Sequence, residues 1–282
     1  MKILSEKHCI IGEGPVWNEF NNKLYQVNGF AKEILQIDIS LNEVKTQKLP
    51  FGVSAIAFSK SGQMLVSCMD GAFILNSDCS RTPLYDTQKY EIRFGNDAKV
   101  GPDGRFYIGT QSSKRVGLGQ ETDGKLYSID KNGEVKTLLD GLILSNGFDW
   151  SMDQKRFYHT DSDTQIIKEY CFDKEKGEIS FTGRKVRVDG VDGLTIDQND
   201  YLYVACWGEG YIAVVDTADM QIKKHISVPA TIPASCCFAG EIMDKFVVVT
   251  ASYGVDLNND KNAGCTFISE LKYKGRKPFL FG

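Results

Sequence analysis

The sequence has few histidines, no paired cysteines, no basic run and no long apolar segment, and each absence excludes a class of protein. Only three histidines occur among 282 residues, and none of the eight cysteines stands in a CxxC pair, which argues against a zinc site. The 33 Lys and Arg residues are scattered and outnumbered by 37 Asp and Glu residues. The net charge of -4 therefore argues against nucleic acid as a partner. No apolar run reaches the length of a membrane-spanning helix.

The N-terminal segment has none of the features of a targeting signal. Residues 1–11 carry Lys2, Glu6 and Lys7 and have no apolar core of the kind found in signal peptides. Several cysteines stand in apolar runs, such as Val204-Ala205-Cys206, which fits buried free thiols in a reducing compartment. We therefore expect a cytoplasmic protein without a membrane partner.

What the sequence contains instead is a repeat. A polar turn, a bulky apolar residue and an alternating or aromatic strand recur six times along the chain. No segment shows the i, i+3, i+4 apolar spacing of a long helix. The apolar anchors of the six copies are Leu24, Met64, Phe106, Phe157, Leu202 and Phe246, and successive anchors are 40, 42, 51, 45 and 44 residues apart.

This repeat predicts the fold. Four short strands in every ~40–50 residues are typical of a propeller blade. We predict an all-β, six-bladed β-propeller with four-stranded blades around a central channel, as a single domain over residues 1–282. Residues 2–10 precede the first copy, and we expect them to complete the last blade beside Thr266-Phe267-Ile268 and so close the ring. A pair of β-sandwiches is the structural alternative, which the even period disfavours.

A polar residue precedes each anchor by ten or eleven positions. The six residues at this phase are Glu13, Ser54, Asn96, Asn146, Asp192 and Ser235. In a propeller this stretch is the innermost strand, so these side chains are expected to converge at the mouth of the channel. Four of them carry carboxylate or amide oxygens, which suit Ca²⁺, Mg²⁺ or Mn²⁺ rather than a soft metal.

A simpler interpretation is that these residues form turns, because Asn and Asp before Gly are common turn residues. Four such residues at one phase of four repeats are harder to attribute to turns, and Glu13 is a poor turn residue. Asp97, Asp149 and Asp197 are expected to cap turns between strands. His159 is expected to be a core histidine rather than part of the site.

At these positions the sequence resembles the senescence-marker-protein, gluconolactonase and luciferin-regenerating-enzyme family of regucalcin-like proteins. The matching stretches are Gly12-Glu13-Gly14-Pro15-Val16-Trp17, residues 96–106, Ser145-Asn146-Gly147-Phe148-Asp149-Trp150-Ser151, Asp192-Gly193 with Asp197, and Ser235-Cys236-Cys237-Phe238. The resemblance implies one divalent metal ion in the channel, with Ca²⁺ ahead of Mg²⁺, Mn²⁺ or Zn²⁺. It also implies that Glu13, Asn146 and Asp192 are the metal ligands and that Asn96 lies near the metal and the substrate.

The activity that the resemblance implies is hydrolysis of a lactone, as in gluconolactonases. The metal would polarise the lactone carbonyl, and Asp192, the catalytic residue, would activate the attacking water as a general base. The expected partner is a small-molecule lactone, and the protein is expected to be a monomer or a weak homodimer. Two alternatives stay open: a calcium- or metal-binding propeller without catalysis, as a regucalcin-like regulator, and a purely protein-binding propeller.

Arg93 is the second residue predicted to bind substrate, beside Asn96. The family usually has Arg two residues before the Asn-Asp pair, whereas Arg93 stands three residues before Asn96, with Gly95 between them. A slip of one residue turns a strand side chain to the other face, unless Gly95 forms a bulge that restores it. The loop from Gln111 to Gln120 has no acidic residue where sugar-binding members can offer one. We therefore expect a lactone less polar than gluconolactone.

Overall fold

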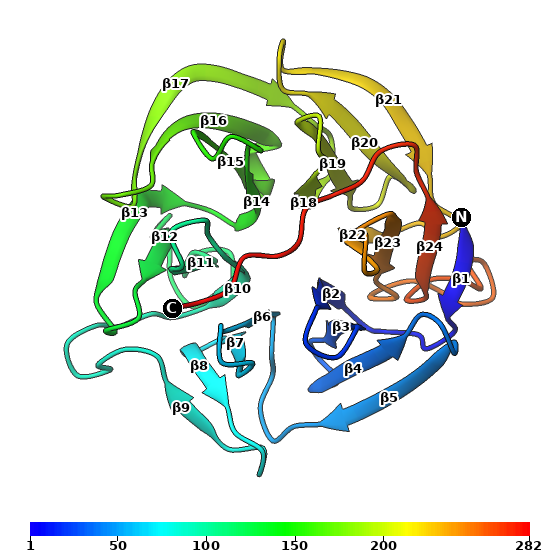
Figure 1. The fold of residues 1–282 in the computed structure, drawn as a ribbon, viewed down its shortest axis with the longest axis horizontal. Helices are drawn as coiled ribbons and strands as arrows, with labels where there is room; N and C mark the ends of the chain where they lie inside the picture. Colours follow the sequence, from blue (N-terminus) through cyan, green and yellow to red (C-terminus); the bar gives the residue numbers. More distant parts are fainter.

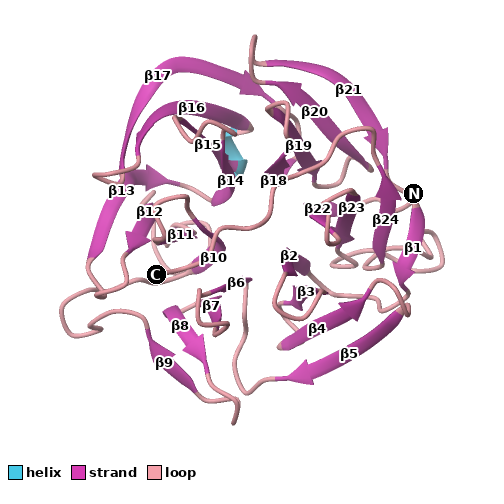
Figure 2. Cartoon of the chain, viewed as in Figure 1, coloured by secondary structure: helices cyan, strands magenta, loops and turns pink.

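The computed structural model describes residues 1–282, which form a ring of six four-stranded antiparallel sheets around a central channel (Figure 1). The prediction of a six-bladed propeller is confirmed. The one helix is a 3-10 helix of three residues, η1 (Ser162–Thr164), and the rest of the regular structure is strand (Figure 2). No helical segment has the length and hydropathy that crossing a membrane requires.

Blades 1 to 5 each place their four strands in chain order from the channel outward. Blade 1 comprises β2 (Gly12–Asn18), β3 (Lys23–Asn28), β4 (Glu33–Asp38) and β5 (Glu43–Lys48). Blade 2 comprises β6 (Ala55–Phe58), β7 (Met64–Cys68), β8 (Gly71–Leu75) and β9 (Arg81–Pro83). Blade 3 comprises β10 (Gly95–Val100), β11 (Phe106–Thr110), β12 (Gly124–Ile129) and β13 (Val135–Leu142).

The second half of the ring follows the same plan. Blade 4 comprises β14 (Ser145–Trp150), β15 (Arg156–Asp161), β16 (Ile166–Asp173) and β17 (Glu178–Arg187). Blade 5 comprises β18 (Val191–Ile196), β19 (Tyr201–Cys206), β20 (Tyr211–Asp216) and β21 (Gln221–Ser227). Blade 6 combines β22 (Pro233–Ala239), β23 (Lys245–Thr250) and β24 (Thr266–Glu270) with the N-terminal strand β1 (Lys2–Ser5). In that blade Lys2 is paired with Ile268, and Ser5 with Thr266.

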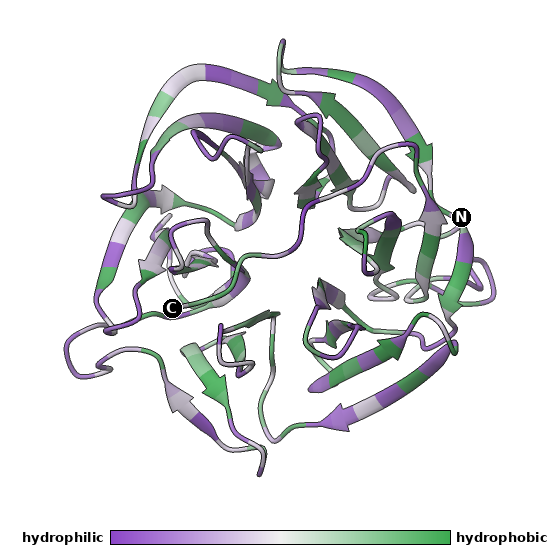
Figure 3. Cartoon of the chain, in the orientation of Figure 1, coloured by the Kyte–Doolittle hydropathy of each residue, from purple (hydrophilic) through white to green (hydrophobic).

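The apolar anchors of the sequence repeat lie in the second strand of every blade. Five of them, Leu24, Phe106, Phe157, Leu202 and Phe246, are fully buried, and Met64 is half-buried. The outermost strands instead mix hydrophilic and hydrophobic residues, and all six residues of β5 are exposed (Figure 3). Apolar side chains of neighbouring blades share common clusters, so the core lies between blades rather than within one.

Five of the six innermost strands carry a shift in register near their start. The shifts lie between Glu13 and Val16, Gly95 and Ala98, Ser145 and Phe148, Val191 and Leu194, and Pro233 and Ser235. Such bulges add a residue to one strand and redirect its side chains. The Gly residues that follow Asn146 and Asp192 therefore stand in strands, not in turns. A Cβ atom at Gly147 would lie 2.4 Å from the Asp192 carbonyl oxygen, so only glycine fits this approach of two inner strands.

The C-terminal segment, residues 274–282, crosses one end of the channel (Figure 1). It contacts all six blades, through Gln198, Met243, Asp149, Glu19, Phe58 and Gly104. Two of these contacts are ion pairs: Arg276 with Asp149, and Lys277 with Glu19 at 2.7 Å. We call this end of the channel the tail end, and the opposite end, where the inner strands begin, the ligand end.

Candidate metal and active site

The four predicted oxygen donors all lie at the beginning of inner strands, at the ligand end. Glu13 is in β2, Asn96 in β10, Asn146 in β14 and Asp192 in β18. The last three fall within the register shift of their strands, and Glu13, which pairs with Val27, stands at the start of the shift in β2. The bulges suspend the regular pairing at these positions, so these side chains need not follow the alternation of the rest of their strands.

Asn146 and Asp192 are in direct contact. The Asn146 Nδ2 donates a hydrogen bond to Asp192 Oδ1, and each residue is only 5% exposed. A turn of the Asn146 amide by 180° would present its Oδ1 instead, because amide nitrogen and oxygen are nearly interchangeable in shape. The pair can therefore fix the Asp192 carboxylate or offer two oxygens to a cation.

Asn96 is held in place by blades 2 and 4. Its Nδ2 donates to the Ser145 carbonyl oxygen at 3.1 Å, and its own carbonyl oxygen accepts the Ser54 hydroxyl at 2.7 Å. Ser54, at the corresponding position of blade 2, thus supports the backbone of β10 rather than offering a free ligand. The Asn96 Oδ1 makes no hydrogen bond within the chain.

The electrostatics of the ligand end are those of uncompensated carboxylates. Burial, followed by the negative charges of Asp192 and Asp97, raises the pKa of Glu13 well above its usual range. Burial and the charge of Asp97 likewise raise the pKa of Asp192, against the Asn146 hydrogen bond and the charge of Arg115, which lower it. None of these three carboxylates forms an ion pair with a Lys, Arg or His side chain of the chain.

The prediction that Asp97 caps a turn is wrong. Its side chain lines a cavity toward the tail end, and burial raises its pKa against the charge of Lys99, which lowers it. Asp97 lies inside β10 and is 8% exposed, and its Oδ1 accepts the Ala98 N–H at 2.8 Å. Asp149 also lies within a strand, β14, so its predicted role as a turn cap is wrong as well. Asp197 does cap a turn: it accepts the N–H groups of Asn199 and Tyr201.

The donor set fits a hard divalent cation. The oxygens of Glu13, Asp192 and Asn146 are of the type that Ca²⁺, Mg²⁺ and Mn²⁺ prefer, and a cation among them would relieve the mutual repulsion that raises the pKa values of Glu13 and Asp192. No three His, Cys, Asp or Glu side chains of the chain converge closely enough to hold a metal by themselves. Further ligands of a bound cation would be neutral oxygens, such as the amide oxygens of Asn146 and Asn96.

Arg93, predicted to bind substrate, precedes β10 and is exposed. Its guanidinium lies 3.8 Å from the Glu91 carboxylate and over the ring of Phe94. The structure does not bring it into contact with the four oxygen donors. Gly95 pairs with Thr110 and begins the same register shift that the other inner strands have. Its lack of a Cβ is explained by blade 2, since a Cβ there would lie 2.3 Å from the Cys68 carbonyl oxygen.

His159 belongs to the core. It is 2% exposed and stacks on Phe148 and Phe157, and its Nε2 is 2.8 Å from the Ser145 hydroxyl. Burial, with a contribution from the charge of Lys168, lowers its pKa to about 3, so the imidazole is neutral at physiological pH.

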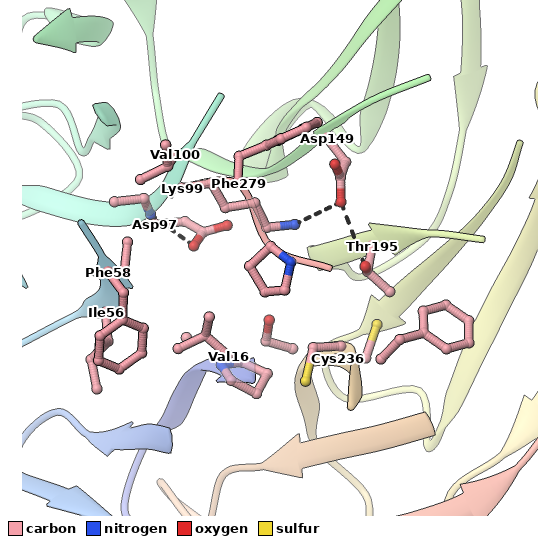
Figure 4. Close-up of a pocket in the computed structure, with 18 of the residues that line it drawn as sticks. Val16, Ile56, Phe58, Asp97, Lys99, Val100, Asp149, Thr195, Cys236 and Phe279 are labelled. Carbon is pink, nitrogen blue, oxygen red and sulfur yellow. Dashed lines mark hydrogen bonds and ion pairs between the residues drawn. The ribbon is translucent and has the colours of Figure 1, made fainter. Parts of the chain in front are cut away.

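At the tail end, the same inner strands carry a network of opposite charges (Figure 4). Lys99 Nζ donates to Asp149 Oδ2 at 3.0 Å and to the Leu194 carbonyl oxygen at 2.7 Å. The second carboxylate oxygen of Asp149 accepts from Arg276, which comes from the C-terminal segment. These residues line a cavity of about 80 Å³ between the inner strands and that segment.

Comparison with known proteins assigns the family. The sequence model described as SMP-30/Gluconolactonase/LRE-like region matches residues 11–252, and the chain belongs to this family. The family includes gluconolactonases and regucalcins. The prediction of the family from the sequence is therefore confirmed.

Relatives cover nearly the whole chain. Human regucalcin is 30% identical over 98% of this chain and 96% of its own length. A Bacillus subtilis protein, "Putative sugar lactone lactonase YvrE", is 29% identical over 98% of this chain and 97% of its own. Among solved structures, a calcium-binding regucalcin from Agrobacterium tumefaciens has a TM-score of 0.88 at 23% identity, with 99% of this chain and 96% of that chain covered. At that identity the likeness supports the fold alone.

Proposed function

We propose that this protein is a divalent-metal-dependent lactone hydrolase, with Glu13, Asn146 and Asp192 as metal ligands. The observation that carries the proposal is the buried set of carboxylates at the ligand end, whose pKa values are raised by burial and by one another and which no cationic side chain neutralises. The relatedness to a protein named as a sugar lactone lactonase supports lactones as the substrate class. The bound cation would act as a Lewis acid toward the lactone carbonyl.

The chain's own residues supply the proton transfers. The Asp192 carboxylate, oriented by the Asn146 amide, accepts a proton from the attacking water as the water oxygen bonds to the carbonyl carbon. The bond from that carbon to the ring oxygen then breaks, and the proton passes to the ring oxygen, which yields a hydroxy acid. Asn96, with its Nδ2 held by Ser145, has a free Oδ1 that can accept a hydrogen bond from a substrate hydroxyl.

The test is hydrolysis of a panel of aldonolactones and simple lactones by purified protein with Ca²⁺, Mg²⁺, Mn²⁺ or Zn²⁺ and with a chelator. We expect the wild-type protein to hydrolyse at least one lactone and to lose this activity in the presence of the chelator. We expect Asp192→Asn to show no such activity. Asp189→Asn is the matched control, since Asp189 is exposed in the connection just before β18 and pairs only with Arg187. Metal binding without turnover of any lactone would contradict the enzyme and favour the alternative of a non-catalytic metal-binding propeller.

A further inference from the structure

The cavity beneath the C-terminal segment reaches up the channel to the level of the proposed metal ligands (Figure 4). Its walls include residues of all six inner strands. Three lining residues stand at or next to the polar positions of the repeat: Gly14 follows Glu13, Asp97 follows Asn96, and Ser235 is itself the polar residue of blade 6. The cavity therefore runs from the ring of oxygen donors to the C-terminal segment.

Ser235 joins the wall of this cavity to the strand that carries Asp192. A Cβ atom on Gly193, the residue that directly follows Asp192, would collide with the Ser235 hydroxyl. The hydroxyl thus lies against the backbone of β18 beside the proposed general base. Asp192 is itself only 5% exposed. A water molecule within reach of its carboxylate therefore lies inside the channel and not in the bulk solvent.

The walls of the cavity carry polar atoms that have no partner in the chain. Asp97 is 8% exposed, and its Oδ1 accepts the Ala98 N–H, whereas its Oδ2 accepts no hydrogen bond. The Nε of Arg276 is buried and has no hydrogen-bond partner. Lys99 uses two of the three N–H groups of its ammonium within the chain, which leaves one.

This combination of size and polarity meets the conditions for ordered water. The volume of about 80 Å³ is several times the ~10–15 Å³ that one water molecule requires. Cavities that stay dry are lined by apolar groups alone, whereas buried water typically bonds to polar atoms that lack other partners. The cavity is also partly open, so water can enter it while the C-terminal segment stays in place.

We propose that this cavity holds ordered water and delivers the attacking water to Asp192 from within the channel. The inference rests on the proposed function. A lactone bound at the ligand end turns one face of its carbonyl group toward solvent and the other toward the channel. A general base must lie about 2.6–3.2 Å from the atom whose proton it accepts. Because Asp192 belongs to the channel wall, the water that it deprotonates attacks the inner face, and the cavity replaces that water.

Entry of water from the ligand end, around the bound substrate, is the competing explanation. On that path the width of the cavity has no influence on the reaction. On the path through the cavity, a narrower passage slows water and excludes a larger nucleophile first. Methanol separates the two paths. Its oxygen bonds to the carbonyl carbon as that of water does, its proton passes to the ring oxygen, and the product is a hydroxy methyl ester in place of a hydroxy acid.

The experiment changes the width of the cavity in both directions at Cys237, which lines it and is 8% exposed. The protein hydrolyses a lactone in water and in a fixed methanol–water mixture, and the ratio of ester to acid is measured. We expect Cys237→Leu to lower kcat about 5- to 10-fold with KM within about 2-fold, and to lower the ratio at least about 3-fold. Cys237→Ala, which widens the cavity, should raise the ratio.

Two further variants complete the series. Ala57→Val narrows the cavity from blade 2 and should change kcat and the ratio in the same direction as Cys237→Leu, so the test does not depend on the folding of one variant. Cys171→Leu makes the larger replacement at an exposed thiol of β16 and is the control. It should leave both kcat and the ratio unchanged.

The ratio distinguishes a failure of this inference from a failure of the proposed function. If wild type hydrolyses the lactone and the ratio is the same in all variants, delivery through the cavity is overturned and the lactone hydrolase stands. A fall in kcat at an unchanged ratio overturns it as well, because structural damage explains that result. A high-resolution crystal structure without ordered water in the cavity would also overturn it. Absence of turnover in wild type, in contrast, refutes the proposed function and the delivery of water together.

Discussion

The same inner strands form both ends of the channel, but the charges at the two ends are arranged in opposite ways. At the ligand end, Asp192 and Asn146 meet without any cationic side chain bonded to the carboxylate. At the tail end, Asp149 lies between the ammonium of Lys99 and the guanidinium of Arg276. Along β14, Asn146 belongs to the ligand end, and Asp149, three residues later, belongs to the charge network of the tail end.

This difference indicates which carboxylates the chain neutralises itself and which it leaves for a ligand. A buried carboxylate is costly unless an opposite charge accompanies it. The chain supplies that charge for Asp149 from Lys99 and Arg276. No Lys, Arg or His side chain forms an ion pair with Glu13 or Asp192, and burial and repulsion raise the pKa values of both. We therefore propose that the tail end is structural and that the ligand end binds an external cation.

The largest effect is expected from one substitution made at the ligand end. Asp192→Asn removes the proposed base and one charged metal ligand, so turnover should fall by about 10²- to 10⁴-fold. Because it also removes a buried, uncompensated charge, the free energy of unfolding without metal should not decrease. Steady-state kinetics measures turnover, and urea denaturation in the presence of a chelator measures the free energy of unfolding. Normal turnover in Asp192→Asn would refute its catalytic role.

The same substitution at the tail end should instead lower the stability of the fold and spare turnover. Asp149→Asn leaves Lys99 and Arg276 without their shared counter-charge. Breaking a fully buried pair costs ~3–5 kcal/mol, but Lys99 is 29% exposed and Arg276 17% exposed, so we expect a loss of about 2 kcal/mol in the free energy of unfolding. Urea denaturation measures this loss. The double variant Lys99→Met, Asp149→Leu should recover part of it, and a single variant as stable as wild type would show that the network is not structural.

Metal addition should stabilise the fold through the ligand end only. A cation at 100 times its dissociation constant stabilises a protein by about 2.7 kcal/mol if only the folded state binds it. We expect Ca²⁺ to raise the Tm of wild type and of Asp149→Asn by similar amounts, and to leave the Tm of Glu13→Gln nearly unchanged. Thermal unfolding with Ca²⁺ and with chelator provides the measurement. An equal rise in Glu13→Gln would place the cation elsewhere.

The last prediction, which shows only under acidic conditions, concerns the neutral core histidine His159. The pKa of His159 is about 3 in the folded protein and ~6.5 when unfolded, so the unfolded chain binds the additional proton between these values. Stability from this group is present above pH ~6.5 and is lost as pH falls toward 3, by at most about 1.4 kcal/mol per pH unit. His159→Phe should reduce the dependence of the free energy of unfolding on pH in this range, which denaturation at a series of pH values measures. An unchanged slope would mean that other groups cause acid unfolding.

Much of this architecture follows from periodicity. The six anchors lie in the second strand of each blade because a closed ring repeats one burial pattern. The four oxygen donors were found by their common phase before these anchors, and all four lie at the ligand end. Their role as metal ligands and the role of Arg93 in substrate binding stay predictions.

What could not be predicted are features that break the repeat. Asp97 was predicted to cap a turn because Asp is a common turn residue, whereas it lies inside β10, within the register shift between Gly95 and Ala98. Arg276 lies beyond the last repeat, so no phase relates it to Asp149 until the chain is folded.

The pairing of β1 with β24 has a consequence for how the chain reaches its native state during synthesis. The partner of Ser5 is Thr266, so β1, which is synthesised before the other strands of the propeller, can pair only after β24, the last of them. Contacts between such distant residues slow folding, since the entropy of closing the intervening chain must be overcome first. Until then, blades 1 to 5 stand as an open row with unpaired apolar surfaces at both ends. A nascent chain is therefore most prone to aggregation in the interval before the sixth blade closes.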